Sequence, residues 1–347
     1  MTFLDSTLST PPLRCGLDLG GRSVTKELDL TVDDWYGLLR LTQDLKDEKK
    51  THDEIQRLRG LNLALVFAKS STRTRCAFEV AAHDQGAHVT YLDPDGTQLG
   101  HKESVKDTGR VLGRMFDGIE YRGFAQENVE ELARSSGVPV WNGLSDMWHP
   151  TQSLCDIFTM LEHTGKASDE ISFAYVGDAR NNVANSLTVA GAMSGMDVRM
   201  VSPTQLQPST NVVTAARTLI QETAGRLTLT ADPREGLSGV DFVYTDAWVS
   251  MGEPKLLWIQ RARQLADYQV DADLMAMSGR GDTAFMHCLP AFHNRHSEVG
   301  EELFHTTGRE AQEVTDDVFE SPQSIVFDQA ENRMHSVKAM LVATLER

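Results

Sequence analysis

The 347-residue chain is poor in cysteine and has no long apolar run. Its four cysteines lie far apart, with neither a C-x-x-C pair nor the Cys/His spacing of a zinc site, which is typical of reduced thiols. No stretch approaches the ~18 consecutive apolar residues of a membrane-spanning helix, and the amino terminus lacks the basic and apolar regions of a signal peptide. We therefore expect a cytoplasmic protein.

Basic residues are also scarce: 33 Lys and Arg stand against 50 Asp and Glu, a formal net charge of -17. This balance disfavours a nucleic acid or an anionic membrane as partner, because both carry negative charge. The chain lacks a G-x-x-x-x-G-K-[ST] loop, and no G-x-G-x-x-G follows a predicted strand, so both nucleotide-binding fingerprints are missing. An anionic ligand would have to be held by a local pocket.

Apolar runs alternate with amphipathic segments and predict two α/β domains, which also suits the chain length. Strands are predicted at 61–67, 88–92, 118–123, 138–144, 171–178, 197–203, 226–232, 241–248 and 284–290, and helices between them include 72–85, 149–166 and a last helix at 330–347. The repeated strand–helix–strand order predicts parallel sheets. We expect a first domain over 1–148 and a second over 149–329; the residues alone leave open which of them the last helix packs on.

The segment "SSTRTRCAF", residues 70–78, follows an apolar run and begins a predicted helix. A helix start offers unpaired N–H groups and the positive end of the helix dipole, and hydroxyls and arginine suit phosphate oxygens. Ser71, Thr72, Arg73 and Thr74 are therefore candidate anion ligands. Alternatively, Ser71 or Thr72 only caps the helix while Arg73 and Arg75 are solvated, and this segment does not separate the two interpretations.

Further polar side chains follow other predicted strands, at the sheet edge where ligands of parallel sheets collect. These are Arg122, His149, Gln152, Asp178, Asn181, Asn182, Asn185, Asp246 and Cys288. Each has a structural alternative, since a lone histidine is commonly structural, an asparagine at a helix start commonly caps it, and a buried thiol is usually inert. None of them decides a function alone.

Seven motifs in order, "STRTR", "YRG", "HPTQ", "GDARNN", "DAWVSMGE", "HCLP" and "AENR", resemble those of the ornithine carbamoyltransferases over nearly the whole chain. The first and third are shared with aspartate carbamoyltransferase and imply only carbamoyl phosphate, whereas "SMG" and "HCLP" resemble the ornithine branch. The resemblance implies an enzyme that transfers the carbamoyl group of carbamoyl phosphate to the side-chain amine of L-ornithine, giving citrulline and phosphate without a metal or an organic cofactor.

The same resemblance implies a fold and an assembly. Each of two domains would be a parallel β-sheet flanked by helices. The domains would be joined by long helices, with the C-terminal helix 330–347 packing back on the first domain. The subunits would form a homotrimer, with a dodecamer of trimers as the alternative. No nucleic acid or membrane is expected as a partner.

The resemblance also assigns roles to individual residues. Carbamoyl phosphate would be bound by Ser71, Thr72, Arg73, Thr74, Gln98 of a neighbouring subunit, Arg122, His149, Gln152, Cys288, Leu289 and Arg333. Ornithine would be bound by Asn182, in preference to Asn181 or Asn185, and by Asp246, Ser250 and Met251. The catalytic set would be Arg122, His149, Asp246 and Cys288, of which the first two polarise the carbonyl group and the others orient the amine.

One position departs from the family pattern, and two other functions stay open. Ala68 stands where an acidic residue usually precedes the lysine before "STRTR", and we expect altered packing or charge there rather than lost activity. The alternatives are a carbamoyltransferase for another amine, such as putrescine, and an anion-binding protein without catalysis. Asn182 together with "SMG" favours an amino-acid acceptor, and intact Arg122, His149 and Cys288 favour catalysis.

Overall fold

The structure is a computed structural model that describes residues 17, 19–94, 103–249 and 254–346. Contacts divide the chain into two compact units, Met1–Gly165 with Glu331–Arg347, and Lys166–Ala330. Gln98, Ser250 and Met251, which the resemblance assigns to the substrates, lie outside the described residues. None of the described helices is long and apolar enough to cross a membrane.

The first unit contains a four-stranded parallel sheet in the order β2-β1-β3-β4. Its strands are β1 (Asn62–Phe67), β2 (His88–Leu92), β3 (Gly118–Arg122) and β4 (Val140–Leu144). Strand β1 is buried from Leu63 to Phe67 because helices cover both faces of the sheet, which is why its apolar run is continuous rather than alternating. The strand order reverses between β1 and β3, and ligands of parallel sheets bind at such a reversal.

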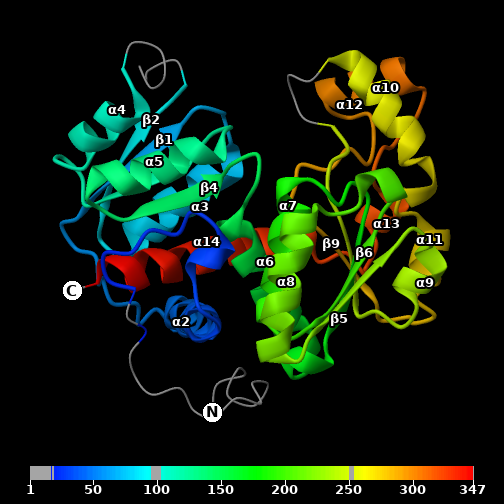
Figure 1. Cartoon of the computed structure of the whole chain (residues 1–347), viewed down its shortest axis with the longest axis horizontal. Coiled ribbons are helices and arrows are strands. Elements are labelled where there is room, and N and C mark those ends of the chain that lie inside the picture. Colours follow the sequence, from blue (N-terminus) through cyan, green and yellow to red (C-terminus); the bar gives the residue numbers. More distant parts are fainter. Residues whose placement is uncertain (1–16, 18, 95–102, 250–253, 347) are drawn as a thin grey trace. The chain divides into compact units, whose positions relative to one another are not determined.

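Helices cover both faces of this sheet (Figure 1). They are α2 (Val32–Thr51), α3 (Thr72–Asp84), α4 (Val105–Leu112), α5 (Gln126–Ser136), α6 (Pro150–Thr164) and the long α14 (Val326–Leu345). Helices α4 and α5 pack together over one face, while α3 and α14 lie on the other. Thr31 caps α2, because its side chain accepts a hydrogen bond from the backbone N–H of Asp34.

Helix α14 confirms the expectation that the C-terminal helix packs on the first domain. Trp141 of β4 donates its indole N–H to Thr344 Oγ1 at 3.0 Å, and the backbone N–H of Gly21 donates to the Thr344 carbonyl at 2.9 Å. The helix begins four residues earlier than the predicted residue 330. Helix α6 also belongs to the first unit, where Ser153 donates to Glu27 at 2.6 Å, so the division lies after Gly165 rather than after residue 148.

The second unit contains a five-stranded parallel sheet in the order β7-β6-β5-β8-β9. Its strands are β5 (Ser172–Val176), β6 (Asp197–Val201), β7 (Arg226–Thr230), β8 (Phe242–Thr245) and β9 (Ala284–His287). The order reverses between β5 and β8, so the loops that follow these two strands form the expected ligand edge. The two parallel sheets flanked by helices confirm the predicted fold class.

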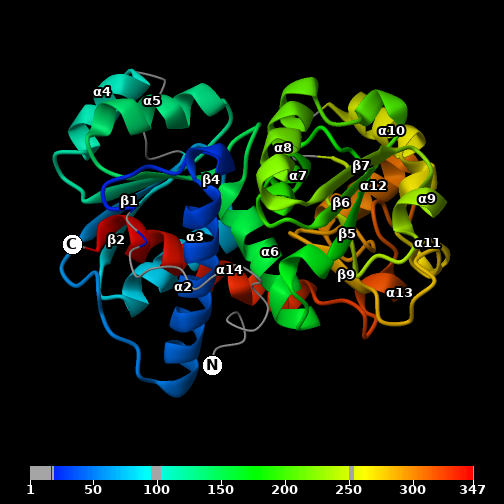
Figure 2. The ribbon, with the colours of Figure 1, turned by 60° about the horizontal axis from the view of Figure 1, so that its bottom comes forward.

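The helices of the second unit lie on both faces of its sheet (Figure 2). Helices α7 (Asn182–Met193) and α8 (Thr210–Thr223) pack together on one face. The other face is covered by α9 (Pro233–Leu237), α10 (Lys255–Gln264), α11 (Ala272–Ala276), α12 (Glu298–Thr307) and α13 (Asp316–Phe319). Short 3₁₀ helices are found at Glu27–Asp29, Ser168–Glu170, Thr204–Leu206 and Ala266–Tyr268.

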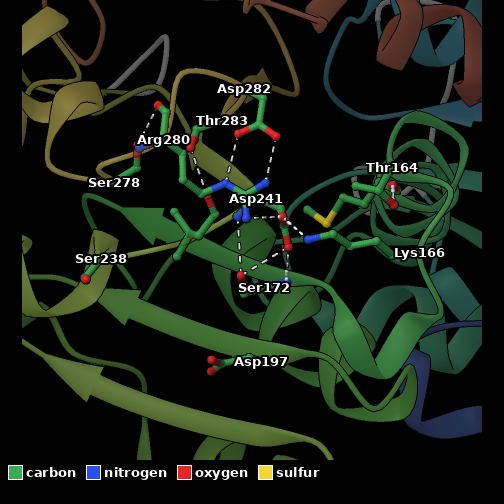
Figure 3. Close-up of polar contacts among 12 residues, drawn as sticks. Thr164, Lys166, Ser172, Asp197, Ser238, Asp241, Ser278, Arg280, Asp282 and Thr283 are labelled. Carbon is green, nitrogen blue, oxygen red and sulfur yellow. Dashed lines mark hydrogen bonds and ion pairs between the residues drawn. The ribbon is translucent and has the colours of Figure 1, made fainter.

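A buried carboxylate ties together the amino ends of the second sheet's strands (Figure 3). Asp241, which directly precedes β8, accepts a hydrogen bond from the backbone N–H of Ser172 at 3.0 Å. Its other oxygen lies 3.2 Å from Arg280 and also receives the ammonium of Lys166. This network fixes one edge of the sheet, while the loops at the opposite edge carry the candidate ligands.

Candidate active site

The "STRTR" segment starts helix α3 directly after β1, as the sequence predicts. Ser71 is the N-cap, and its hydroxyl accepts a hydrogen bond from the backbone N–H of Thr74 at 3.3 Å. Arg75 points away from this turn, because it pairs with Glu79 at 2.9 Å and stacks on the ring of Tyr91. Capping therefore accounts for Ser71 and a surface ion pair accounts for Arg75, whereas the buried Thr74 needs another explanation.

Two arginines from distant parts of the chain converge on the Thr74 hydroxyl. Arg122, the last residue of β3, donates to Thr74 Oγ1 at 3.1 Å, and Arg333 of α14 donates to the same oxygen at 3.2 Å. Arg333 also hydrogen-bonds Thr151 Oγ1 at 3.2 Å and the side-chain carbonyl of Gln152. Two like charges directed at one hydroxyl repel each other, so this arrangement favours an anion beside them.

His149 lies buried next to the same arginines. Burial lowers the pKa of His149 well below 6.5, and the charges of Arg333 and Arg122 lower it further, so the ring is neutral at physiological pH. Its Nε2 lies 3.4 Å from the Arg333 guanidinium, which can only donate, and we therefore infer that the proton is on Nδ1. A neutral imidazole with a fixed N–H is suited to polarise a carbonyl oxygen without adding charge.

Glu120 belongs to this cluster, and the sequence analysis missed it. It lies two residues before Arg122 in β3, hence on the same face of the strand, and it is fully buried. Burial raises the pKa of Glu120 well above 4.5, against the opposing effect of Arg122 and Arg333. Among the described residues neither carboxylate oxygen has a hydrogen-bond partner, which favours the neutral acid. The only sequence signal was an acidic residue inside an otherwise buried strand.

The second unit brings a separate set of candidates together at the β5/β8 reversal. Asp246 directly follows β8, and its two oxygens accept hydrogen bonds from the Cys288 thiol at 3.1 Å and the Asn181 amide at 3.1 Å. Asn181 also donates to the hydroxyl of Tyr175 at 2.7 Å. Burial raises the pKa of Asp246 above 3.8, although His287 and the Cys288 hydrogen bond act in the opposite direction.

The three asparagines at the start of α7 have different surroundings. Asn181 is the N-cap, because its side-chain oxygen accepts from the backbone N–H of Ala184 at 2.7 Å. Asn182 accepts from the N–H of Val183 at 2.9 Å and is partly exposed, whereas Asn185 is buried. Capping thus accounts for Asn181, and the assignment of Asn182 to ornithine stays a prediction.

A buried histidine and carboxylate support the segment after β9. His287 Nδ1 accepts a hydrogen bond from the backbone N–H of Leu289 at 2.8 Å, so its proton is on Nε2, which lies 3.4 Å from Glu313 Oε1. Glu313 also accepts from the backbone N–H of Phe292 at 2.6 Å. Leu289 has φ of 61°, a left-handed conformation that costs a non-glycine residue about 1–2 kcal/mol. The His287 hydrogen bond offsets part of this strain, directly beside Cys288.

The structure therefore separates the predicted site residues into two groups. The first unit brings together Thr74, Arg122, His149, Gln152 and Arg333, with Ser71, Thr72 and Arg73 on the adjoining helix start. The second brings together Asp246, Cys288 and Leu289, with Asn182 at the start of α7. Ala68, at the unusual position, donates its backbone N–H to the Arg122 carbonyl at 2.8 Å, an interaction that does not depend on the side chain.

Two family models match the chain. The carbamoyl-P binding domain of aspartate/ornithine carbamoyltransferase matches residues 22–162, and the Asp/Orn binding domain of the same family matches residues 169–344. Among curated relatives, the catabolic ornithine carbamoyltransferase of Pseudomonas putida is 58% identical over 310 residues, which cover 89% of this chain and 92% of the relative.

Solved structures agree with the family models. The ornithine carbamoyltransferase of Pyrococcus furiosus is 38% identical, with a TM-score of 0.85 over 94% of this chain and 98% of the other. The anabolic ornithine carbamoyltransferase of Campylobacter jejuni is 31% identical, with a TM-score of 0.82 over 92% of this chain and 97% of the other.

Proposed function

This chain belongs to the aspartate/ornithine carbamoyltransferase family, and we propose that its two side-chain clusters bind the two substrates of that chemistry. The enzyme transfers the carbamoyl group of carbamoyl phosphate to the side-chain amine of ornithine, and the products are citrulline and phosphate. The Thr74 cluster would bind carbamoyl phosphate and the Asp246 cluster would bind ornithine. The match of the carbamoyl-P binding model to residues 22–162 and of the Asp/Orn binding model to 169–344 supports this division.

The convergence of Arg122 and Arg333 on Thr74 is the observation that carries the carbamoyl phosphate assignment. The phosphate would lie at the start of α3, within reach of the side chains of Ser71, Thr72 and Arg73 and of the backbone N–H groups of the first turn. Its negative charge would relieve the repulsion between the two guanidinium groups. Gln152 would help to hold the carbamoyl end through its contact with Arg333.

Arg122 and His149 are proposed to polarise the carbamoyl carbonyl group. When the amine attacks the carbon, negative charge develops on this oxygen, and a preorganised donor is worth about 2.7–4 kcal/mol in comparable enzymes. Because the His149 ring is neutral and buried, it can lie against the carbonyl oxygen without adding a charge to the site. The C–O bond to phosphate then breaks, and phosphate leaves as a dianion held by the arginines.

The Asp246 and Cys288 pair is proposed to orient the ornithine side chain. An alkyl amine with a pKa near 10.4 is almost wholly protonated at neutral pH and must lose a proton to attack. Asp246 already accepts the thiol hydrogen of Cys288, so both groups face one point where an ammonium can donate. Burial raises the pKa of Asp246 and makes it a better proton acceptor than an exposed carboxylate. Glu313 and His287 would act as positioning residues by holding Leu289 beside Cys288.

The assembly and the location of the enzyme are further proposals. We propose a homotrimer in which Gln98 of a neighbouring subunit contacts the phosphate, with assembly into a dodecamer as the alternative. We also propose a cytoplasmic location, because the Cys288–Asp246 hydrogen bond requires a reduced thiol. Whether the cell runs the reversible reaction toward citrulline or toward ornithine depends on metabolite levels, since one site serves both directions.

A comparison of acceptors and of two arginine variants tests this function. Citrulline and its analogues are measured with ornithine, putrescine, aspartate and N-acetylornithine at equal concentration. We expect a strong preference for ornithine and a loss of about 10²–10³ in kcat for Arg122→Ala. Arg75→Ala is the matched control, because Arg75 lies on the same segment but pairs with Glu79 at the surface. Equal losses in the two variants, or preference for putrescine, would contradict the proposal.

A further inference from the structure

One group of possible metal ligands in the second unit shares no residue with the set proposed for catalysis. It consists of His293, Asp316 and Glu320, and one ligand atom of each lies within 4.8 Å of the others. His293 belongs to the segment that follows β9, whereas Asp316 begins α13 and Glu320 follows its last residue. Residues four apart share one side of a helix, so both carboxylates can face the histidine.

Neighbouring side chains hold this group in place. The His293 ring stacks on Phe319, with 3.8 Å between ring centroids and an interplanar angle of 15°. The side-chain oxygen of Asn294 accepts the backbone N–H of His296 at 3.0 Å, which directs its amide nitrogen to Asp316 Oδ1 at 2.7 Å. Such supporting contacts orient ligands around bound metal ions and raise affinity.

His293 Nδ1 lies 2.6 Å from Asp316 Oδ1. A hydrogen bond of this length places a proton between two atoms that are both good metal ligands, and a divalent ion can replace that proton with a small opening of the pair. One imidazole and two carboxylates suit zinc, cobalt or nickel, which accept nitrogen and oxygen ligands together. Magnesium and calcium prefer oxygen ligands alone.

The surroundings leave space for the remaining ligands. A cavity of about 560 Å³ adjoins the group and is lined by His293, Asn294, His296 and Asp316, among others, so that water can complete the coordination. Two arginines also line it, but Arg295 is held by Glu301 at 2.8 Å, and the Arg309 guanidinium lies 5.7 Å from the centre of the Trp248 ring. Asp317 adds a third carboxylate to the turn that carries Asp316 and Glu320.

We propose that His293, Asp316 and Glu320 bind a divalent transition-metal ion, and that this ion stabilises the second unit without taking part in carbamoyl transfer. The ion would cross-link the segment after β9 to α13, which lies beside α11 in Figures 1 and 2. Two contacts already join the segment after β9 to the residues just before α13: Gln312 N–H donates to the Phe292 carbonyl at 2.9 Å, and Phe292 N–H donates to Glu313 Oε1 at 2.6 Å.

The test must separate this site from the group Asp246, His287 and Cys288, which also has ligand atoms within 4.8 Å of one another. Titration with Co²⁺ does so, because a cysteine thiolate gives a cobalt charge-transfer band in the near ultraviolet and a histidine–carboxylate site does not. The full chain with Cys288→Ser is used as the background, so that the Asp246 group has lost its thiolate ligand. We expect this protein to bind one Co²⁺ per chain, with visible absorption and a rise in Tm as Co²⁺ is added.

Within that background, His293→Ala, Asp316→Asn and Glu320→Gln should each weaken Co²⁺ binding at least tenfold and reduce the Tm shift. Asp316 and Glu320 are exposed, so their variants are expected to fold even if His293→Ala does not. The matched control is His305→Ala, because His305 also pairs with a glutamate, Glu301 at 3.1 Å, but that glutamate is bound by an arginine. The control should bind Co²⁺ like its parent. Absence of Co²⁺ binding in the background protein, or unchanged binding in Asp316→Asn and Glu320→Gln, would overturn the proposal.

Discussion

The replacement His335→Gln should make the enzyme markedly less sensitive to acid. His335 lies on α14, and only 3% of its side chain is exposed. Burial lowers the pKa of His335 from 6.5 to about 3, and the charges of Lys338, Lys46 and Lys49 contribute, with Glu162 acting in the opposite direction. The folded protein therefore keeps this ring neutral at pH values where the unfolded chain protonates it.

The sign and the size of the effect follow from proton linkage. Because the pKa of His335 is lower in the folded state than in the unfolded state, its neutral ring contributes fully to stability above pH 6.5. This contribution is lost as the pH falls toward 3. Between pH 7 and pH 5 the unfolded ring takes up most of one proton while the folded ring takes up almost none. His335 alone then lowers the free energy of unfolding by about 2 kcal/mol over this range.

Urea unfolding at pH 7 and pH 5, at one protein concentration, measures this difference. The His335→Gln variant should lose about 2 kcal/mol less than the parent between the two pH values. Val337→Ala, a fully buried position on the same helix, is the control: it should lower stability by a similar amount at both pH values and leave the pH dependence unchanged. If His335→Gln follows the same pH dependence as the parent, the buried neutral histidine is not the cause.

Two further predictions concern the second unit. His287→Asn keeps an acceptor near the position of Nδ1 for the Leu289 N–H, whereas His287→Gln does not. The value of kcat should therefore fall about 5- to 150-fold further in the Gln variant, as expected for about 1–3 kcal/mol of lost positioning. Equal kcat in both variants would show that His287 does not act by holding the Leu289 N–H. Asp241→Asn removes the ion pairs with Lys166 and Arg280 and should lower the free energy of unfolding by about 2 kcal/mol, with KM unchanged. Urea unfolding and steady-state kinetics measure the two quantities. A decrease in unfolding free energy of less than about 0.5 kcal/mol would contradict the importance of this network.

The strands of both sheets could be predicted from the sequence because their signals are local. A run such as Leu63–Phe67 must be buried on both faces, and the turn residues that follow it mark where the strand ends. The last helix was predicted from its apolar spacing, but its start at Val326 was missed because no capping residue marks it. The order of the strands has no local signal, since any of them can pair with any other in a parallel sheet.

The residues that the sequence analysis missed are buried acids. Glu120 in β3 and Glu313 before α13 look like ordinary polar positions, because solvated carboxylates are common and burial cannot be read from one chain. Their roles depend on which cations and N–H groups lie opposite them in the folded protein. Glu120 lies near Arg122 and Arg333, and Glu313 faces His287.

The sequence by itself determined the class of the fold and the family, and it predicted which residues would bind the two substrates, because these depend on short motifs and on local periodicity. Only the tertiary structure decided that Arg122 and Arg333, more than 200 residues apart, donate to the same hydroxyl, and that the Asp246 carboxylate receives both Cys288 and Asn181. The reason is physical: the pKa values and the hydrogen-bond partners of these groups are set by burial and by neighbours that parallel strand pairing brings together from distant parts of the chain.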